Sequence, residues 1–412
     1  MKSRMTVIAL VIAAFAFLPA LALAGGDPPP PTGFKVYPNL QGVAQNSIGM
    51  MWQTHNADKG KVKIAANSNM SGAVTYTMSV SQTRQKATIS GLAANTVYYY
   101  QVVADGETSP KGSFVTSLPK GSRLPFRFIV YGDSRDSSWY EDIVSKYGDN
   151  DDHLPVCISM NNYAPDFLVH AGDLVRDGND TDLIYNFFDV EKELLANNPV
   201  LPAYGNHEFS GGNGTGNTTL DSFLLPPPGS PNFAYYSMVY GNVKIIVLNT
   251  GEGVFASDNF DIIKQGSTQW NWLYSQVASA AADADIDHIF ITLHAPPFSC
   301  ANFGDNTQVQ NALNPVLALT GKVKAVFMGH EHDYQHLKKN GMNYILSGGA
   351  GSSMMDYPWV GDQDDTSAQL IKYAEVLNYL IVDVSGSSIH CEARSVQGNG
   401  SSTSALLESF NL

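Results

Sequence analysis

Five short apolar runs between residues 126 and 328 constrain the fold of this 412-residue chain more than any other feature. Each run has the length of a strand, and helix-like stretches lie among them at 183–196, 268–282 and 308–319. Strands that alternate with helices predict an α/β core in which a layered β-sheet is flanked by helices. The apolar runs lie at 126–131, 167–170, 244–248, 288–293 and 323–328.

The region before this core has a different pattern. It contains short runs rich in β-branched and aromatic residues, separated by turn residues, which predict an all-β sandwich. A stretch at 118–125 with Pro, Gly and Ser separates the two regions. We therefore expect a sandwich at 27–118 and an α/β (α+β) domain at 125–412. The strands of the sandwich are expected at 47–52, 61–64, 73–78, 86–89, 97–103 and 112–116.

The first residues have the pattern of a secretion signal. Two basic residues near the start precede an apolar run at 7–18, and Ala22 and Ala24 give the small-x-small pattern of a cleavage site. The apolar run is short for a membrane span, which makes a membrane anchor the weaker alternative. We expect residues 1–24 to be a signal peptide that is cut after Ala24, leaving a secreted or periplasmic protein without a membrane segment.

The composition excludes some partners. A formal net charge of −14 argues against a general electrostatic attraction to nucleic acid or to an anionic membrane. The chain has three cysteines, Cys157, Cys300 and Cys391, which allow one disulfide and one thiol in an exported protein. The sequence does not choose the pair, and a core of this size needs no disulfide framework.

Polar residues follow directly after the apolar runs and after a short extended segment that ends at Ala203. In open α/β sheets, ligand sites gather at the carboxyl ends of the strands, so we expect these segments to meet at one edge. Their Asp, Asn and His side chains are ligands that hard or borderline metal ions prefer. The candidate ligands are Asp133, Asp173, Asn206, His294, His330 and His332.

The order of these motifs resembles that of the calcineurin-like metallophosphoesterases. The chain has Gly-Asp twice, then Gly-Asn-His-Glu, His-Ala-Pro and Gly-His-Glu-His. The stretch 89–100 is similar to the tyrosine corner of fibronectin type III domains, and such a sandwich before such a core resembles the purple acid phosphatase branch. The resemblance implies a fibronectin type III-like sandwich at 27–118 and a metallophosphoesterase domain at 125–412.

The resemblance also implies a pair of metal ions. Asp173 would bridge them, and Asp133 and His332 would complete the protein ligands of the first ion. Two cations at short spacing lower the pKa of a water molecule and clamp the attacking and leaving oxygens of a phosphate ester. The ligands that would hold the second ion together with Asp173 are Asn206, His294 and His330.

Two further residues of the same motif have implied roles in catalysis. His207 would protonate the leaving oxygen or stabilise its charge, and Glu208 would orient His207. The implied activity is hydrolysis of small phosphate esters by a metal-activated water, with phosphomonoesters favoured. A phosphodiesterase or nucleotidase at the same site is the alternative among enzymes. A non-catalytic secreted binding protein with a degenerate metal site is the alternative from another class.

Two positions depart from the family pattern. Arg176 stands where purple acid phosphatases have a Tyr that binds ferric iron, and Arg135 stands where the other common branch has a His. The first ion therefore lacks one protein ligand, and we expect a labile first site and no purple colour, with divalent Fe, Mn or Zn fitting the site as well as ferric iron. Each arginine either balances carboxylate charge or binds the substrate phosphate. His170 either supports the metal ligands from behind or belongs to the core, and we favour the first role.

Overall fold

The structure is a computed structural model that describes residues 31–135, 150–209, 219, 221–225, 235–250, 263–354 and 366–412. The signal peptide expected at 1–24 lies outside these residues. In the described ranges, no helix is both long and apolar enough to cross a membrane. Residues 32–412 form one compact unit.

The N-terminal part consists of strands, as the sequence predicts. In β5 (Gln82–Ser90) alternate residues are buried, so that Ala87 and Ile89 face a core that also holds Trp52 and Tyr100. One group of strands has the order β1 (Phe34–Val43), β2 (Ser47–Asp58), β5. The other has the order β4 (Val74–Thr77), β3 (Lys61–Ala65), β6 (Val97–Ala104), β7 (Glu107–Thr108), with β8 (Gly112–Val115) beside β6.

The first of these groups is continuous with the central sheet of the molecule. Strand β1 pairs in parallel with β11 (Val200–Pro202) at Gln41 and Val200. The Gln41 amide adds two bonds, to the carbonyl of Ser222 at 3.0 Å and from the N–H of Leu224 at 2.7 Å. The sequence did not predict this connection, because nothing in the local pattern of either strand specifies its partner.

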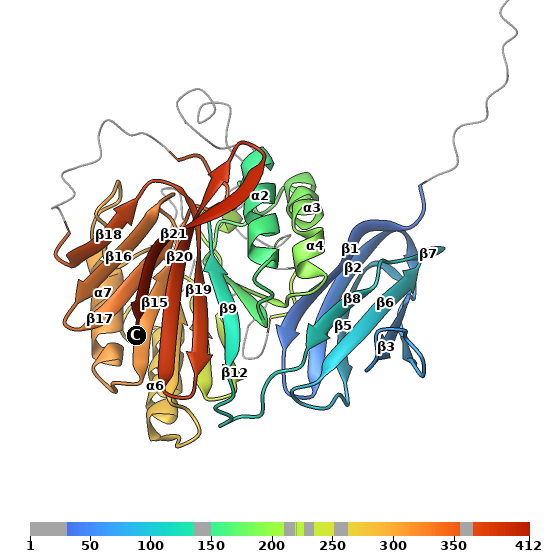
Figure 1. Cartoon of the computed structure of the whole chain (residues 1–412), viewed down its shortest axis with the longest axis horizontal. Coiled ribbons are helices and arrows are strands. Elements are labelled where there is room, and N and C mark those ends of the chain that lie inside the picture. The colour runs from blue at the N-terminus through green and yellow to red at the C-terminus, as the bar shows by residue number, and fades with distance from the viewer. Residues whose placement is uncertain are drawn as a thin grey trace, which may run out of the picture. The chain divides into compact units, whose positions relative to one another are not determined.

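Two sheets pack face to face in the core (Figure 1). Phe128 and Phe167 stack with ring centroids 5.0 Å apart, and Phe290 of the opposite sheet meets Phe128 edge-on at 5.5 Å. The first sheet continues from β11 through β10 (Phe167–His170), β9 (Phe126–Tyr131), β19 (Leu377–Ser385), β20 (Ser388–Gly398) and β21 (Ser401–Asn411). The second has the order β12 (Tyr236–Tyr240), β13 (Val243–Val247), β14 (His288–Thr292), β15 (Val323–Met328), β17 (Met342–Ser347), β16 (Tyr334–Lys339), β18 (Gln369–Ala374).

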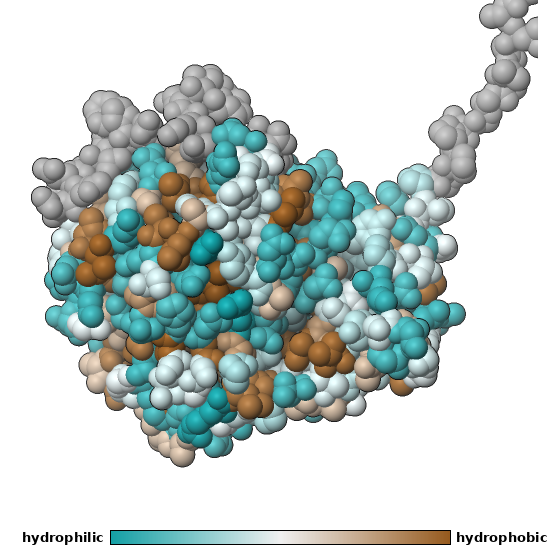
Figure 2. Space-filling model, in the orientation of Figure 1, coloured by the Kyte–Doolittle hydropathy of each residue, from teal (hydrophilic) through white to brown (hydrophobic). Residues whose placement is uncertain are grey.

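Helices cover the outer face of each sheet and complete a four-layer α/β core, which confirms the predicted fold class. Helices α2 (Asn150–Asn161), α3 (Thr181–Val190) and α4 (Lys192–Leu195) pack on the first sheet, and α6 (Thr268–Ala282) and α7 (Thr307–Leu317) on the second. On the face drawn in Figure 2, apolar residues are scattered among polar ones.

The expected helix at 183–196 is wrong in one respect, because the structure divides it into α3 and α4 at Glu191. The Glu191 side chain is fully buried and accepts hydrogen bonds from the Tyr131 hydroxyl at 3.0 Å. The backbone of Glu191 departs from the helical conformation at this point (φ −85°, ψ 1°).

Candidate metal centre

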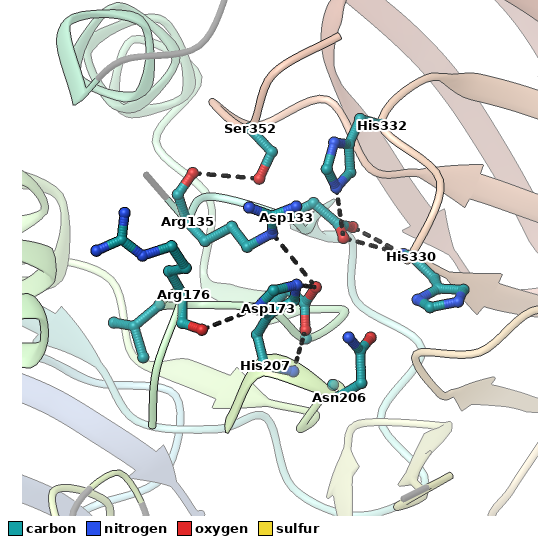
Figure 3. A network of polar contacts seen from close by, with 12 residues as sticks. Asp133, Arg135, Asp173, Arg176, Asn206, His207, His330, His332 and Ser352 are labelled. Carbon is teal, nitrogen blue, oxygen red and sulfur yellow. Dashed lines mark hydrogen bonds and ion pairs between the residues drawn. The ribbon is translucent and has the colours of Figure 1, made fainter. Parts of the chain in front are cut away.

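The structure brings the six candidate ligands together at the carboxyl ends of the core strands (Figure 3). Asp133 follows β9 and Asp173 follows β10, which are neighbours in the first sheet. His294 follows β14 and His330 follows β15, which are neighbours in the second. The site therefore lies where the ends of the two sheets meet.

Three atoms with lone pairs lie around the Nε2 atom of His294, which is the fourth donor of the set. Asp173 Oδ1 lies 3.3 Å from it, and Asn206 Oδ1 and His330 Nδ1 each lie 3.2 Å from it. These separations match the edge of a tetrahedron whose bonds to a central ion are about 2.0 Å long, the usual metal–ligand distance for N and O. The donor set therefore fits a metal ion between these four residues.

A second set of donors adjoins the first. The carboxylate of Asp133 accepts hydrogen bonds from the N–H of His330 at 3.0 and 3.1 Å, and its Oδ1 lies 3.8 Å from His332 Nε2. Ligand atoms of Asp133, Asp173 and His294 all lie within 4.8 Å of one another. The two carboxylates are thus close enough to face a pair of ions.

Backbone carbonyls orient the imidazoles. The Nδ1 atom of His294 donates to the carbonyl of Ala171 at 2.9 Å, and that of His332 donates to the carbonyl of Ser353 at 2.7 Å. These bonds fix the tautomer in which Nε2 carries a lone pair directed at the site, as is usual for histidines that bind metals.

The backbone near the site takes unusual conformations. Asp133, Asp173 and His330 have φ values of 58°, 55° and 80°, in the left-handed region that non-glycine residues rarely adopt. Gly205 also packs so closely that a Cβ atom there would overlap the Asp173 carboxylate. The chain is held in this geometry by its neighbours rather than by local preference.

The electrostatics of the cluster favour a bound cation. Burial alone would raise the pKa of Asp173, but the charges of His294 and His207 outweigh it and hold that pKa well below its ordinary value. Burial would lower the pKa of His294, but the Asp173 carboxylate raises it to about 9. Burial, helped by the Asp173 charge, raises the pKa of Asp133. Positive charge between these carboxylates is therefore strongly stabilised.

His207 lies at the edge of the cluster. Its Nε2 atom is 3.9 Å from Asp173 Oδ2, and its Nδ1 atom donates to the carbonyl of Arg176 at 2.8 Å. Burial lowers the pKa of His207, although the Asp173 charge opposes this effect. The lone pair or proton on Nε2 consequently faces the site.

Glu208, which the resemblance gives the role of orienting His207, makes its described hydrogen bonds to backbone groups. The buried Glu208 carboxylate accepts hydrogen bonds from four backbone N–H groups at 2.7–3.3 Å, and none of its described bonds reaches the His207 ring. The chain turns at this point and directs Glu208 into the interior, where its side chain is fully buried. Its four donors are the N–H groups of Asp173, Leu174, Val175 and Gly205.

The two arginines differ in direction (Figure 3). The Arg135 guanidinium reaches into the cluster, where its Nε lies 3.7 Å from Asp173 Oδ2, and only 5% of the side chain is exposed. The Arg176 guanidinium points away from Asp173. Behind the ligands, the Nε2 atom of His170 lies 2.9 Å from the Ser134 hydroxyl, in the position expected for a supporting group.

A loop at 348–353 that supports the site was not predicted from the sequence. The N–H of Ala350 bonds the carbonyl of Gly132 at 3.0 Å, and the N–H of Ser352 bonds that of Asp133 at 2.9 Å. The Ser352 hydroxyl donates to the carbonyl of Arg135 at 3.2 Å. Two of these bonds join backbone groups, and the third uses a serine hydroxyl, which occurs in many loops. The residue types of the loop therefore did not indicate that it contacts the site.

A second buried group, His153, Cys157 and Glu191, was also missed, because its members carry no motif. His153 donates from Nδ1 to the carbonyl of Ala350 at 2.6 Å, and its Nε2 lies 3.0 Å from Glu191. The Cys157 sulfur is almost equally far from both ring nitrogens, 3.8 and 3.5 Å, so it does not lie along the Nε2 lone pair. The group supports the 348–353 loop. All three cysteines of the chain are buried and free.

Comparisons with known proteins agree with this site and fold. The family model of the calcineurin-like phosphoesterases matches residues 126–334, and the model of the purple acid phosphatase N-terminal domain matches residues 34–116. Tartrate-resistant acid phosphatase type 5 of Rattus norvegicus is 28% identical over 212 residues, which cover 46% of this chain and 62% of that protein. An uncharacterised protein of Mycobacterium tuberculosis is 29% identical over 265 residues, which cover 60% of this chain and 50% of that protein.

Solved structures share the fold at lower identity. A purple acid phosphatase from yellow lupin (Lupinus luteus) seeds superposes with a TM-score of 0.70 at 18% identity, covering 91% of this chain and 74% of that chain. PhoD superposes with a TM-score of 0.70 at 14% identity, covering 92% and 90%. The chain spans only half to about three fifths of the length of the two curated relatives.

Proposed function

The chain belongs to the calcineurin-like phosphoesterase family, and from this premise we propose that it is a metal-dependent hydrolase of small phosphate esters. The observation that carries the proposal is the central position of Asp173. Its Oδ1 lies 3.3 Å from His294 Nε2, while its Oδ2 lies 3.7 Å from Arg135 Nε and 3.9 Å from His207 Nε2. A carboxylate with one oxygen on each side suits a bridge between two sites.

We assign the protein ligands as the sequence suggests. Asp173, Asn206, His294 and His330 would hold one ion, and Asp133, His332 and Asp173 the other. Two such ions supply Lewis acidity, which lowers the pKa of a water molecule and neutralises charge on the phosphate. The ion held by Asp133, His332 and Asp173 has fewer protein ligands, so we expect it to exchange more readily. Divalent Fe, Mn or Zn would suit the site.

Two residues would act on the substrate itself. His207, with Nδ1 fixed by the Arg176 carbonyl, presents Nε2 to the site and would give a proton to the leaving oxygen. Arg135, held in the cluster, would bind a phosphate oxygen. Glu208 would position the metal ligands, because its carboxylate accepts hydrogen bonds from the backbone N–H groups of both Asp173 and Gly205.

The proposal extends to the N-terminal domain, to export and to the preferred ester. The N–H of Ala93 donates to the Tyr98 hydroxyl at 2.9 Å, which supports a tyrosine corner and a fibronectin type III-like sandwich at 27–118. The remaining chain, 125–412, would be the catalytic domain. Residues 1–24 would direct export, and phosphomonoesters would be preferred over diesters.

Paired hydrolysis assays test the proposal. The metal-loaded protein should hydrolyse a phosphate monoester faster than its diester analogue, and His207→Ala should slow turnover by about 10²- to 10⁴-fold, the usual contribution of general acid catalysis. Elemental analysis of both proteins should give equal metal content. Faster diester cleavage would favour the phosphodiesterase alternative, and a fully loaded protein without turnover would favour a binding protein.

A further inference from the structure

An exposed phenylalanine lies against one of the proposed metal ligands. The Phe303 ring stacks on the His330 imidazole, with centroids 4.1 Å apart and an interplanar angle of 27°. Nevertheless, 55% of the Phe303 surface is exposed, and the residue belongs to none of the described hydrophobic clusters. One face of the ring is thus fixed on the metal centre while much of the remainder meets solvent.

The loop that carries Phe303 is anchored by buried side chains. The Glu331 carboxylate, 2% exposed, accepts hydrogen bonds from the N–H of Phe303 at 2.7 Å and from the Ser299 hydroxyl at 3.0 Å. The amide oxygen of Gln335, also buried, accepts one from the N–H of Cys300 at 3.0 Å. Glu331 stands between His330 and His332 in the sequence, so the loop and the metal ligands share one support.

This anchoring separates Phe303 from an ordinary exposed apolar residue. A ring that is free to move on the surface loses its orientation, whereas Phe303 is held by its own backbone bond and by the His330 ring. A planar group brought beside His330 could stack on such a ring or meet its edge. A saturated group of the same size would gain contact area but not the aromatic geometry.

We propose that Phe303 is a specificity-determining residue, an aromatic platform that favours phosphate esters whose leaving group carries an aromatic ring next to the ester bond. This inference rests on the proposed function, because His330 must lie beside the bound phosphate for the leaving group to reach Phe303. The platform acts on the organic part of the substrate, and the polar residues of the site act on the phosphate.

Matched esters test the platform. Benzyl phosphate and cyclohexylmethyl phosphate have similar size and both release a primary alcohol, so they differ mainly in aromaticity. The wild-type protein should prefer the benzyl ester in kcat/KM by about 3- to 10-fold, the range of aromatic pair energies. Phe303→Leu should bring that ratio close to 1. Tyr274→Leu, which changes an exposed aromatic residue of α6, should leave the ratio unchanged.

Binding of the corresponding phosphonates, which are not hydrolysed, gives a second readout. Calorimetry should show the same preference for benzylphosphonate over cyclohexylmethylphosphonate in the wild type and its loss in Phe303→Leu, with metal content unchanged in both. An equal loss for both ligands, or no preference in the wild type, would overturn the platform and leave the proposed function intact. A loaded wild type that binds benzylphosphonate preferentially but cleaves neither ester would overturn the proposed function alone.

Discussion

The N-terminal strands and the metal centre both contain residues with left-handed backbone, but they use them differently. In the N-terminal part Met70, Asn95 and Asp105 have φ values of 48–60° in turns that are at least partly exposed. At the site, Asp133 and Asp173 adopt the same conformation while almost completely buried. In turns of the first kind water can also reach the polar groups, whereas the buried turns of the second kind need partners from several strands.

The carboxylates of the two regions show the same contrast. Glu107 is partly buried and accepts bonds from the N–H of Phe34 and the hydroxyl of Tyr37, both at 2.9 Å. Glu208 is fully buried and accepts four backbone bonds beside Asp173. The Glu107 carboxylate therefore stabilises the N-terminal strands. Substitution of a single buried polar group at the site, such as Glu208, would leave several hydrogen-bond donors without an acceptor.

The largest effect is expected when the same substitution is made at an aspartate of each region. Asp173→Asn should remove metal and reduce kcat/KM by about 10³-fold or more, since metal ions supply several kcal/mol of transition-state stabilisation. Asp105→Asn should leave activity and metal content unchanged, because Asn also tolerates left-handed backbone. Elemental analysis and steady-state kinetics measure both, and full activity in Asp173→Asn would remove the distinction between the regions.

Glu208→Gln and Glu107→Gln compare the buried carboxylates. In Glu208→Gln the new side-chain amide would direct its own N–H groups at backbone N–H groups. We therefore expect a loss of about 2–4 kcal/mol in the free energy of unfolding, against about 1 kcal/mol for Glu107→Gln. Denaturant unfolding measures both changes. Equal losses would mean that the four backbone bonds of Glu208 add nothing, contrary to the account.

Substitution of the two arginines tests which of them binds the substrate phosphate. Arg135→Ala should weaken competitive inhibition by inorganic phosphate about 10- to 100-fold, the value of a charge-assisted hydrogen bond. Arg176→Ala should change it less than about twofold, because its guanidinium points away from Asp173. Phosphate affinity retained in both variants would refute a role for either in binding the substrate.

The smallest effect concerns pH and the N-terminal strands. Desolvation would raise the pKa of Asp105, but hydrogen bonds from Asn56 and Gly33 lower it below its ordinary value of 3.8. The stabilisation is therefore present above that value and is lost as pH falls through the lowered pKa. The Tm of the wild type should fall slightly more than that of Asp105→Asn between pH 5 and pH 3, and parallel curves would contradict this.

Local patterns predicted most of the fold. The helix expected at 268–282 coincides with α6, whose first turn is capped by the Ser267 side chain. Helix α2 was not predicted, because Pro155 interrupts its sequence and its apolar residues show no helical period. The pairing of β1 with β11 depends on residues far apart in the chain, and no local pattern encodes it.

The site was predictable to the extent that each residue follows a strand. The six candidate ligands meet because parallel strands end at a common edge. Tertiary packing determines the features that were not predicted. These are the inward turn of Glu208, the opposite directions of Arg135 and Arg176, and the stacking of Phe303 on His330. Side-chain direction at these positions is set by neighbours distant in sequence, so the residue types alone could not give it.

Anomalous diffraction from crystals of the metal-loaded protein would locate the bound ions. We expect two ions about 3.5–4 Å apart, the usual spacing of two-metal sites, with the Asp173 carboxylate bound to both. A single ion, or a pair of ions out of bonding reach of Asp173, would contradict this expectation.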